Sequence, residues 1–144
     1  MYFDDYSIGQ VLTSRGRTVT EADIVNFAGI SGDFVELHMN EEYSKLGPFG
    51  RRIAHGALIF SISTGLMTQM MHDHSTMIAL SGIDRMRFTA PVFIGDTVRV
   101  AMKVVDKQQK DAGRGLVVFD STVTNQRGET VIVYTERLML KCRA

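Results

Sequence analysis

Hydrophobic residues in the second half of the chain recur at every second position, which is the spacing of a half-buried β-strand. The clearest example lies between residues 96 and 109, where Val98, Val100, Met102 and Val104 alternate with Arg99, Ala101, Lys103 and Val105. The same analysis predicts further strands at residues 76–83, 84–92, 115–126 and 129–141. Glycine-containing segments at residues 110–115 and 125–129 predict hairpin turns, and Pro91 predicts a strand edge or a bulge.

The first half of the chain shows helical spacing instead. Thr20 is a favourable N-cap, and the two acidic residues that follow it suit the positive end of a helix dipole. Ile24, Phe27 and Ala28 then form one apolar stripe. A helix is therefore predicted from Thr20 to about residues 29–32.

A longer helix is predicted from near His55 to about Met71. Its apolar residues lie almost all round, which is typical of a buried helix. A short helix is predicted before it, at residues 40–46, and the stretch at residues 31–38 fits neither a helix nor a strand.

One buried helix followed by several hairpin-linked strands predicts an α+β fold, with a curved antiparallel sheet wrapped around the long central helix. A lone sheet of this kind leaves an unpaired edge strand. Two copies of the chain that pair edge to edge would cover that strand, so a homodimer is expected.

The composition limits the classes of partner. The 16 basic and 16 acidic residues cancel, so no overall charge draws the chain to nucleic acid or to an anionic membrane. The length of 144 residues suits one domain, residues 1–144. The longest apolar run, residues 57–60, is far shorter than the roughly 18 residues that span a bilayer. Without a signal-peptide pattern, and with Cys142 as the single cysteine, a soluble cytoplasmic protein is expected.

Two fragments carry candidate chemistry. In SGDFVELH, residues 31–38, Asp33 is followed five residues later by His38. One interpretation is ordinary turn chemistry and a surface histidine. The other is an acid–base pair that converges on one water and transfers protons at neutral pH.

The second fragment, RIAHGALIF, places Gly56 at the start of the long helix. A small residue there permits close packing. It also leaves the backbone N–H groups of the first turn accessible, so that they can stabilise negative charge on a ligand oxygen. The sequence alone leaves both interpretations open.

Together the fragments resemble one family. TEADIVNFAGISGDFVELHMNEEYSKLGPFGRRIAHGALIFSISTGL, residues 20–66, is similar to the hydratase motif of the MaoC-like (R)-specific enoyl-CoA hydratases. RFTAPVFIGDTVRV, residues 87–100, is similar to the strand segment that those proteins carry downstream. The resemblance covers almost the whole chain and implies a single hot-dog fold.

The resemblance also implies an activity. Asp33 and His38 match the catalytic pair of the family, and Gly56 matches the glycine whose amide forms the oxyanion hole. Such an enzyme adds water to a trans-2-enoyl-CoA to give an (R)-3-hydroxyacyl-CoA, or catalyses the reverse dehydration. It needs no metal and no cofactor, since coenzyme A is part of the substrate. The implied partners are an acyl-CoA thioester and further copies of the chain, in a homodimer or larger homo-oligomer.

The sequence departs from the family pattern beside the catalytic pair. The family has Asn and Pro where this chain has Val35 and Glu36, and valine cannot form the hydrogen bonds of asparagine. This change is compatible with a slower hydratase, a different acyl group, or a protein that only binds acyl-CoA. A hot-dog thioesterase, which would direct water at the thioester carbon, is the other alternative.

Further residues are candidates for substrate binding. Phe60, Ser63, Thr64 and Met67 follow Gly56 along one side of the helix, where they would line an acyl pocket or form plain core. The resemblance points to Thr64 and Met67 as determinants of chain length. The other candidates are Val35, His55 and Arg87. Arg87 would either meet a coenzyme A phosphate or belong to a solvated face.

Histidines raise the question of a metal site. Asp33, His38 and His55 could together hold zinc, but their spacing matches no common ligand motif. His72 and His74 point to different sides of a helix and suit a solvated helix end. His55 is expected to fix the entry of the long helix by hydrogen bonding.

Overall fold

A computed structural model of residues 1–144 contains a sheet of six strands and four α-helices. The strands are β1 (Val11–Thr13), β2 (Arg17–Thr18), β3 (Met77–Phe88), β4 (Thr97–Gln109), β5 (Arg114–Thr124) and β6 (Thr130–Lys141). The helices are α1 (Glu21–Ser31), α2 (Glu36–Met39), α3 (Glu41–Lys45) and α4 (Gly56–Met70), with the 3-10 turns η1 (Phe3–Asp5) and η2 (His74–Thr76).

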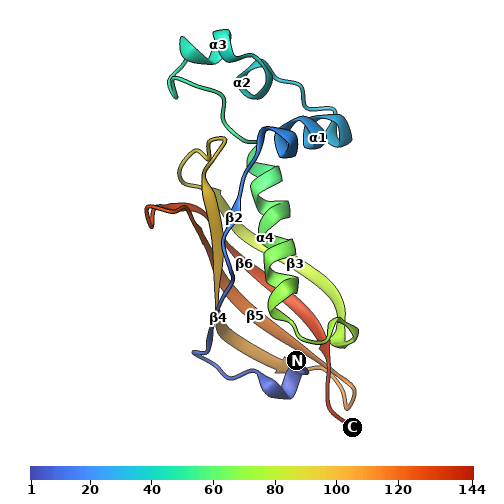
Figure 1. Ribbon diagram of the computed structural model, residues 1–144. Helices are drawn as coiled ribbons and strands as arrows, with labels where there is room; N and C mark the ends of the chain where they lie inside the picture. The colour runs from blue at the N-terminus through green and yellow to red at the C-terminus, as the bar shows by residue number, and fades with distance from the viewer.

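The sheet is antiparallel and curved, with the strand order β1-β4-β5-β6-β3 and with β2 paired to β4. The helix α4 crosses its concave face, while α1, α2 and α3 gather at the end where α4 begins (Figure 1). This is the α+β hot-dog arrangement that the resemblance implied, with the sheet wrapped around a central helix.

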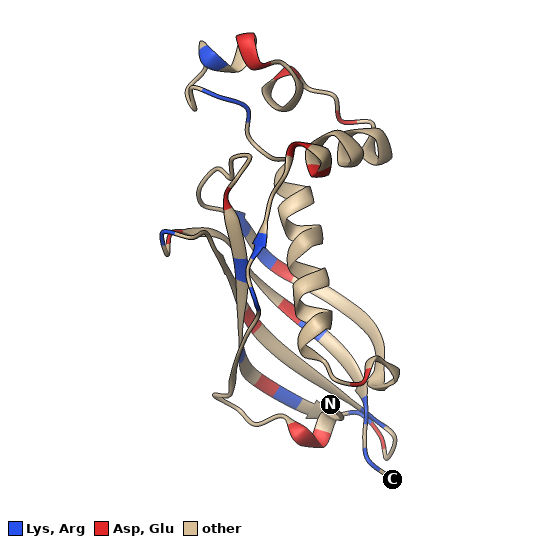
Figure 2. Ribbon diagram, viewed as in Figure 1, with Lys and Arg blue, Asp and Glu red and all other residues tan.

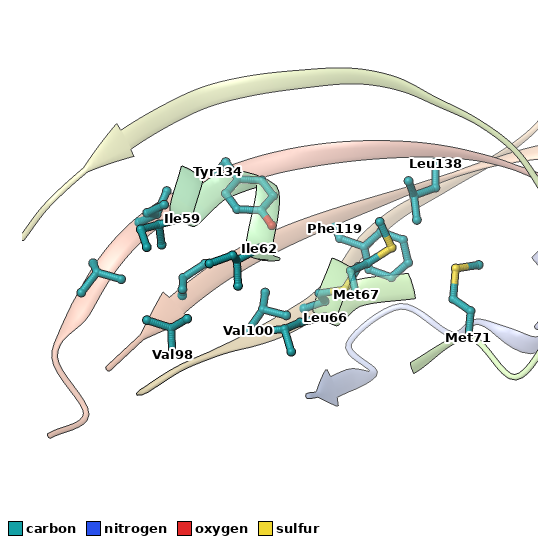
Figure 3. Close-up of a cluster of buried hydrophobic side chains, with 14 of the residues drawn as sticks. Ile59, Ile62, Leu66, Met67, Met71, Val98, Val100, Phe119, Tyr134 and Leu138 are labelled. Atoms are coloured by element: carbon teal, nitrogen blue, oxygen red, sulfur yellow. The ribbon is translucent and has the colours of Figure 1, made fainter. Parts of the chain in front are cut away.

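The core forms where α4 meets the sheet. Ile59, Ile62 and Leu66 of α4 are buried against inward-facing residues of the strands, among them Val100 and Phe119 (Figure 3). The alternation predicted along β4 is confirmed, since its even-numbered hydrophobic residues are fully buried. Burying such side chains contributes about 1.5–3 kcal/mol each, which accounts for the apolar composition of α4.

Two predictions about strands were wrong. Residues 76–92 do not form two strands, because β3 runs continuously from Met77 to Phe88 through several register irregularities. One of them lies at Arg85, which has a positive φ of 52°. Pro91 lies beyond the end of β3, in a loop. The strands β1 and β2 were not predicted, since two or three residues carry too little periodicity to be recognised.

The predicted helices are confirmed, with one addition. Thr20 caps α1: its hydroxyl accepts from Asp23 N at 3.2 Å, and the Asp23 carboxylate accepts from Thr20 N at 2.9 Å. Gly32 ends α1 with a positive φ of 77°. Residues 31–38 fitted neither a helix nor a strand in the sequence. In the structure this stretch leads into the one-turn helix α2, which carries His38.

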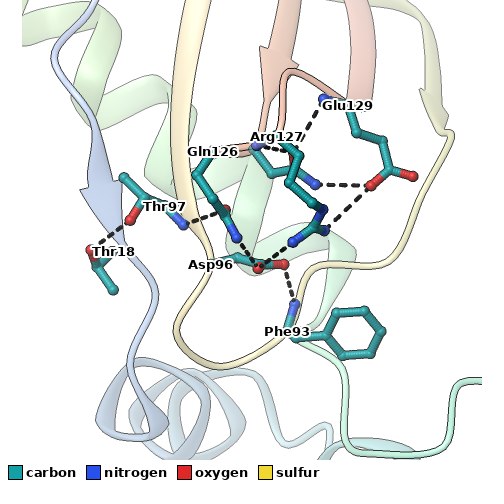
Figure 4. Close-up of polar contacts among 8 residues, drawn as sticks. Thr18, Phe93, Asp96, Thr97, Gln126, Arg127 and Glu129 are labelled. Carbon is teal, nitrogen blue, oxygen red and sulfur yellow. Dashed lines mark hydrogen bonds and ion pairs between the residues drawn. The ribbon is translucent and has the colours of Figure 1, made fainter.

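The loop after β3 is held by Asp96 (Figure 4). Its buried carboxylate accepts hydrogen bonds from Phe93 N at 3.0 Å and Gln126 Nε2 at 2.8 Å, and it lies 3.5 Å from the Arg127 guanidinium. Burial by itself would raise the pKa of Asp96, but these contacts outweigh it and lower that pKa. The same loop pairs with residues 53–54 through the bridge Ile53–Phe93 and the bond from Ala54 N to Val92 O.

Charged residues are absent from α4 and lie on the strands, the turns and the helices α1 to α3 (Figure 2). None of the helices has both the length and the apolar character that a membrane-crossing segment requires.

Candidate active site

Asp33 is set by the turn that follows α1. The Ser31 hydroxyl accepts from Asp33 N at 3.1 Å, and Asp33 Oδ1 accepts from Val35 N at 3.3 Å. These contacts between close neighbours are typical of Asp and Ser in turns. They leave Oδ2 of the half-exposed carboxylate free of protein hydrogen bonds, so that it can face a ligand.

His38 lies on α2, with its side chain largely enclosed. Its Nδ1 lies 2.7 Å from the carbonyl oxygen of Ile53. A carbonyl can only accept, so Nδ1 carries the proton, and in the neutral ring Nε2 presents a lone pair. The structure therefore orients His38 as a proton acceptor at Nε2.

The two side chains meet as the resemblance implied. His38 Nε2 lies 4.0 Å from Asp33 Oδ2, which is too far for a direct hydrogen bond. One water that donates two hydrogen bonds of ordinary length holds its acceptors roughly 4 to 4.5 Å apart. The arrangement can thus hold a single water between a carboxylate and an imidazole.

The side chain of His55 lies beneath this pair, with 2% of the residue exposed. It occupies the N-cap position of α4 but makes no capping hydrogen bond. The expected hydrogen bond at the helix entry is nevertheless present, and it joins the start of α4 to the Asp33 turn. The Nε2 atom of His55 lies 2.9 Å from the main-chain oxygen of Asp33, and its ring stacks on that of His38 with centroids 3.9 Å apart.

Donor atoms of Asp33, His38 and His55 lie within 4.8 Å of one another, a separation at which three side chains could share a metal ion. The two imidazole planes are inclined by 29° in a stacked arrangement, and lone pairs of imidazole lie in the ring plane. The lone pairs of the two rings therefore lie in nearly parallel planes, stacked one above the other, and do not converge on one ion. The group suits a bridging water better than a cation.

Gly56 is the first residue of α4, where backbone N–H groups have no intrahelical acceptor. A Cβ at this position would lie 2.6 Å from the ring of Phe88. Glycine is thus required for the close approach of β3 to the helix start. This packing role and the predicted oxyanion role are compatible, because both depend on the missing side chain.

A cavity of about 480 Å³ opens beside the start of α4. Its walls are mostly apolar and come from three parts of the chain, including Phe49 before α4, Phe88 at the end of β3 with Pro91 after it, and Ile132 of β6. Gly56 belongs to this lining. The segment that carries His55 and Gly56 therefore borders both the water-binding pair and an apolar cavity.

The other predicted residues lie outside that cavity lining. Met67 is buried in the core, Phe60 packs edge-on against Tyr134, and the Thr64 hydroxyl donates to Ser61 O at 2.7 Å. Val35 caps α2 with its side chain more than half exposed.

Arg87 is placed on a different surface. It pairs with Val133, and both line a polar cavity with Asp120 and Thr135. Tyr134, the neighbour of Val133 on β6, packs toward α4, so Arg87 lies on the sheet face that points away from α4. Within one chain, Arg87 is not part of the group around Asp33.

Sequence reasoning missed a buried polar group between α4 and the sheet. Ser63 Oγ lies 2.9 Å from the Tyr134 hydroxyl, and Ser121 Oγ donates to Glu136 Oε1 at 2.7 Å. Burial raises the pKa of Glu136 to about 7. The signal in the sequence was Glu136 at an inward position of β6, where every second residue is otherwise hydrophobic: Ile132, Tyr134, Leu138 and Leu140.

The chain is similar to several known proteins. The family model described as MaoC like domain matches residues 6–126. An (R)-specific enoyl-CoA hydratase of Rhodospirillum rubrum is 35% identical over 143 residues, which cover 99% of this chain and 93% of that protein.

Two further proteins extend the comparison. Protein MaoC of Klebsiella aerogenes is 38% identical over 109 residues, which cover 76% of this chain and 32% of that protein. This chain thus matches about a third of that relative's length. A crystal structure described as the monoamine oxidase regulatory protein from Archaeoglobus fulgius has a TM-score of 0.93 at 39% identity, covering 100% of this chain and 96% of that one.

Proposed function

Because the chain belongs to the MaoC-like domain family, we propose that it is a hydro-lyase that adds water to a trans-2-enoyl-CoA, or removes water in the reverse reaction. The relatives named hydratase or dehydratase support this class of reaction. The single observation that carries the proposal is the 4.0 Å separation of His38 Nε2 and Asp33 Oδ2, which suits one water.

In the proposed mechanism, Asp33 and His38 hold that water over C3 of the substrate. The water oxygen forms a bond to C3, and its proton reaches C2 through one of the two side chains. The carbon–carbon double bond becomes a single bond, and no redox step is needed. The neutral tautomer of His38, which is set by Ile53 O, leaves Nε2 ready to accept a proton.

Gly56 supplies the third element of the proposed mechanism. As hydroxide adds to C3, negative charge moves onto the thioester oxygen. A backbone N–H in the first turn of a helix stabilises such charge, since it is a free donor at the positive end of the helix dipole. Without a side chain, Gly56 leaves that donor open to the thioester oxygen.

We also propose that the chain forms a homodimer through β3. This strand pairs with β6 on one side only, so its other edge carries unpaired backbone groups. Ile78 and Leu80 on β3 are exposed large hydrophobic residues. If the β3 strands of two copies paired edge to edge, their backbone groups would be hydrogen bonded and these side chains would be covered. The molar mass of the protein in solution tests this proposal.

The test is a panel of crotonyl-CoA and of longer and branched enoyl-CoA thioesters, followed by the loss of absorbance of the conjugated double bond. Turnover should fall at least about 100-fold in Asp33→Asn and in His38→Asn. The asparagine at 38 keeps a donor for Ile53 O while it removes Nε2. His72→Asn, an exposed matched control, should be fully active.

Each alternative gives its own result in the same assay. Release of free CoA, detected with a thiol reagent, would indicate a thioesterase. Binding of the thioester without either reaction would indicate a binding module. Full activity of both Asp33→Asn and His38→Asn would remove the proposed mechanism.

A further inference from the structure

His55 contacts both members of the proposed catalytic pair although it lies deeper in the molecule. Its Nε2 is 2.9 Å from the main-chain oxygen of Asp33, and its ring stacks on His38 at 3.9 Å. Phe27 of α1 packs edge-on against the same ring, with centroids 5.0 Å apart. One side chain thus joins α1, the Asp33 turn and α2 to the start of α4.

The contacts of His55 define its tautomer. The oxygen of Asp33 can only accept, so Nε2 of His55 carries the proton and Nδ1 is an acceptor. This Nδ1 is buried and has no hydrogen-bond partner. Burying an unpaired acceptor costs free energy of folding, which an apolar ring of similar size would avoid. The bond from Nε2 to Asp33 O offsets this cost, so the net contribution of the imidazole to stability does not by itself explain a histidine at this position.

We propose that His55 is a positioning residue that sets the distance between Asp33 and His38; the proposal rests on the hydro-lyase function given above. Its Nε2–H holds the backbone of Asp33, and its ring supports the face of His38. Because Nδ1 is enclosed, His55 does not itself contact the reacting atoms.

The two catalytic residues depend on His55 to different degrees. His38 is also fixed through Nδ1 by the 2.7 Å bond to Ile53 O. Outside its own turn, the only hydrogen bond of Asp33 is the one from His55, since its other hydrogen bonds are to Ser31 and Val35. Loss of the Nε2–H donor should therefore displace Asp33 more than His38.

Two variants separate the donor from the ring. His55→Gln keeps an N–H donor at about the position of the histidine Nε2 atom and removes the stacked ring. His55→Phe keeps an aromatic ring and removes the donor. Displacement of a catalytic group by about 1 Å can lower a rate about 100-fold. For His55→Phe we expect kcat to fall by about that factor, with KM and the melting temperature close to those of the wild type.

For His55→Gln we expect kcat within about tenfold of the wild type, because the bond to Asp33 O is restored. A role in packing alone predicts the opposite order, with His55→Phe active and His55→Gln impaired. That order, or equal and full activity of both variants, would overturn the proposal. If the wild type hydrates no enoyl-CoA in the panel, the hydro-lyase function fails first, and the positioning role fails with it.

Nitrogen NMR of the histidine rings gives a test that does not depend on turnover. In the wild type, the proton of His55 should reside on Nε2 and that of His38 on Nδ1. A proton on Nδ1 of His55 would contradict the proposal even if the enzyme is active. In His55→Phe, the His38 tautomer should persist, since Ile53 O still accepts its proton.

Discussion

The buried carboxyl of Glu136 gives the protein a pH-dependent stability that one substitution should remove. Glu136 is fully buried on β6, and burial raises its pKa from 4.5 to about 7. Replacement by glutamine keeps an oxygen that accepts from Ser121 and removes the ionisation. In the wild type, Ser121 Oγ donates a hydrogen bond to Glu136 Oε1 at 2.7 Å.

The magnitude follows from the two pKa values. Below pH 4.5 the carboxyl is neutral in both the folded and the unfolded chain, and its full contribution to stability is present. Between pH 4.5 and about 7 the unfolded chain ionises first, so stability falls as pH rises. A difference of about 2.5 units corresponds to a loss of about 3 kcal/mol, which is complete above pH 7.

The assay is chemical or thermal unfolding of wild type and Glu136→Gln at several values between pH 4.5 and 8. The amide group of the glutamine has no hydrogen-bond partner at the position of Oε2, which lowers the free energy of unfolding by about 1–3 kcal/mol. This loss of stability does not vary with pH. The stability of the variant relative to wild type should therefore rise by about 3 kcal/mol over this range, or about 10 °C in melting temperature.

The difference between two chains is the informative quantity, because all other titrating groups contribute equally to both. Glu42→Gln at the surface is a matched control and should leave the pH dependence unchanged. Parallel stability curves for wild type and Glu136→Gln would refute the reasoning. They would show that the protein interior does not favour the neutral form of this carboxyl.

Three further predictions concern the site and its support. Gly56→Ala should lower stability by about 1 kcal/mol, because the new methyl group contacts the Phe88 ring. Adding Phe88→Leu to Gly56→Ala should restore the melting temperature. It should not restore turnover, since the methyl group still covers the backbone amide of residue 56. Asp96→Asn should lower stability by about 2 kcal/mol at pH 7 in denaturant titrations. Because its contacts lower the pKa of Asp96, the difference in stability between wild type and Asp96→Asn should shrink as the pH falls through that pKa. A difference in stability that stays constant with pH would contradict the role of the ionised carboxylate. Thr64→Phe should leave the preference for acyl chain length unchanged, since Thr64 lies outside the lining of the apolar cavity. A lower activity on longer acyl chains would instead support the role that the resemblance implies for Thr64.

Much of the fold was predictable because the responsible interactions are local or periodic. The capping box of Thr20 and Asp23 joins residues three apart, and the burial of Val98 and Val100 follows from alternation along one strand. The length and apolar character of α4 likewise predicted a central helix. These features depend on each residue's near neighbours and on one buried face, which a sequence displays directly.

Other features could not be read from such patterns. His38 and Ile53 are 15 residues apart in the chain, and Asp33 and His55 are 22 apart, yet both pairs are hydrogen bonded. No periodicity reports such contacts, since they depend on how α2 and α4 come together. The continuous course of β3 depends on its partner β6, against which irregular residues such as Arg85 are accommodated.

In the candidate site too, some features could be predicted from the sequence and others depend on the tertiary structure. Its residue types, a carboxylate, an imidazole and a glycine at a helix start, could be identified from motifs, because chemistry requires those groups. Their separation of 4.0 Å and the tautomers of the two histidines arise from packing between distant segments. Distance, hydrogen-bond partner and burial exist only once the chain is folded, and these quantities control proton transfer.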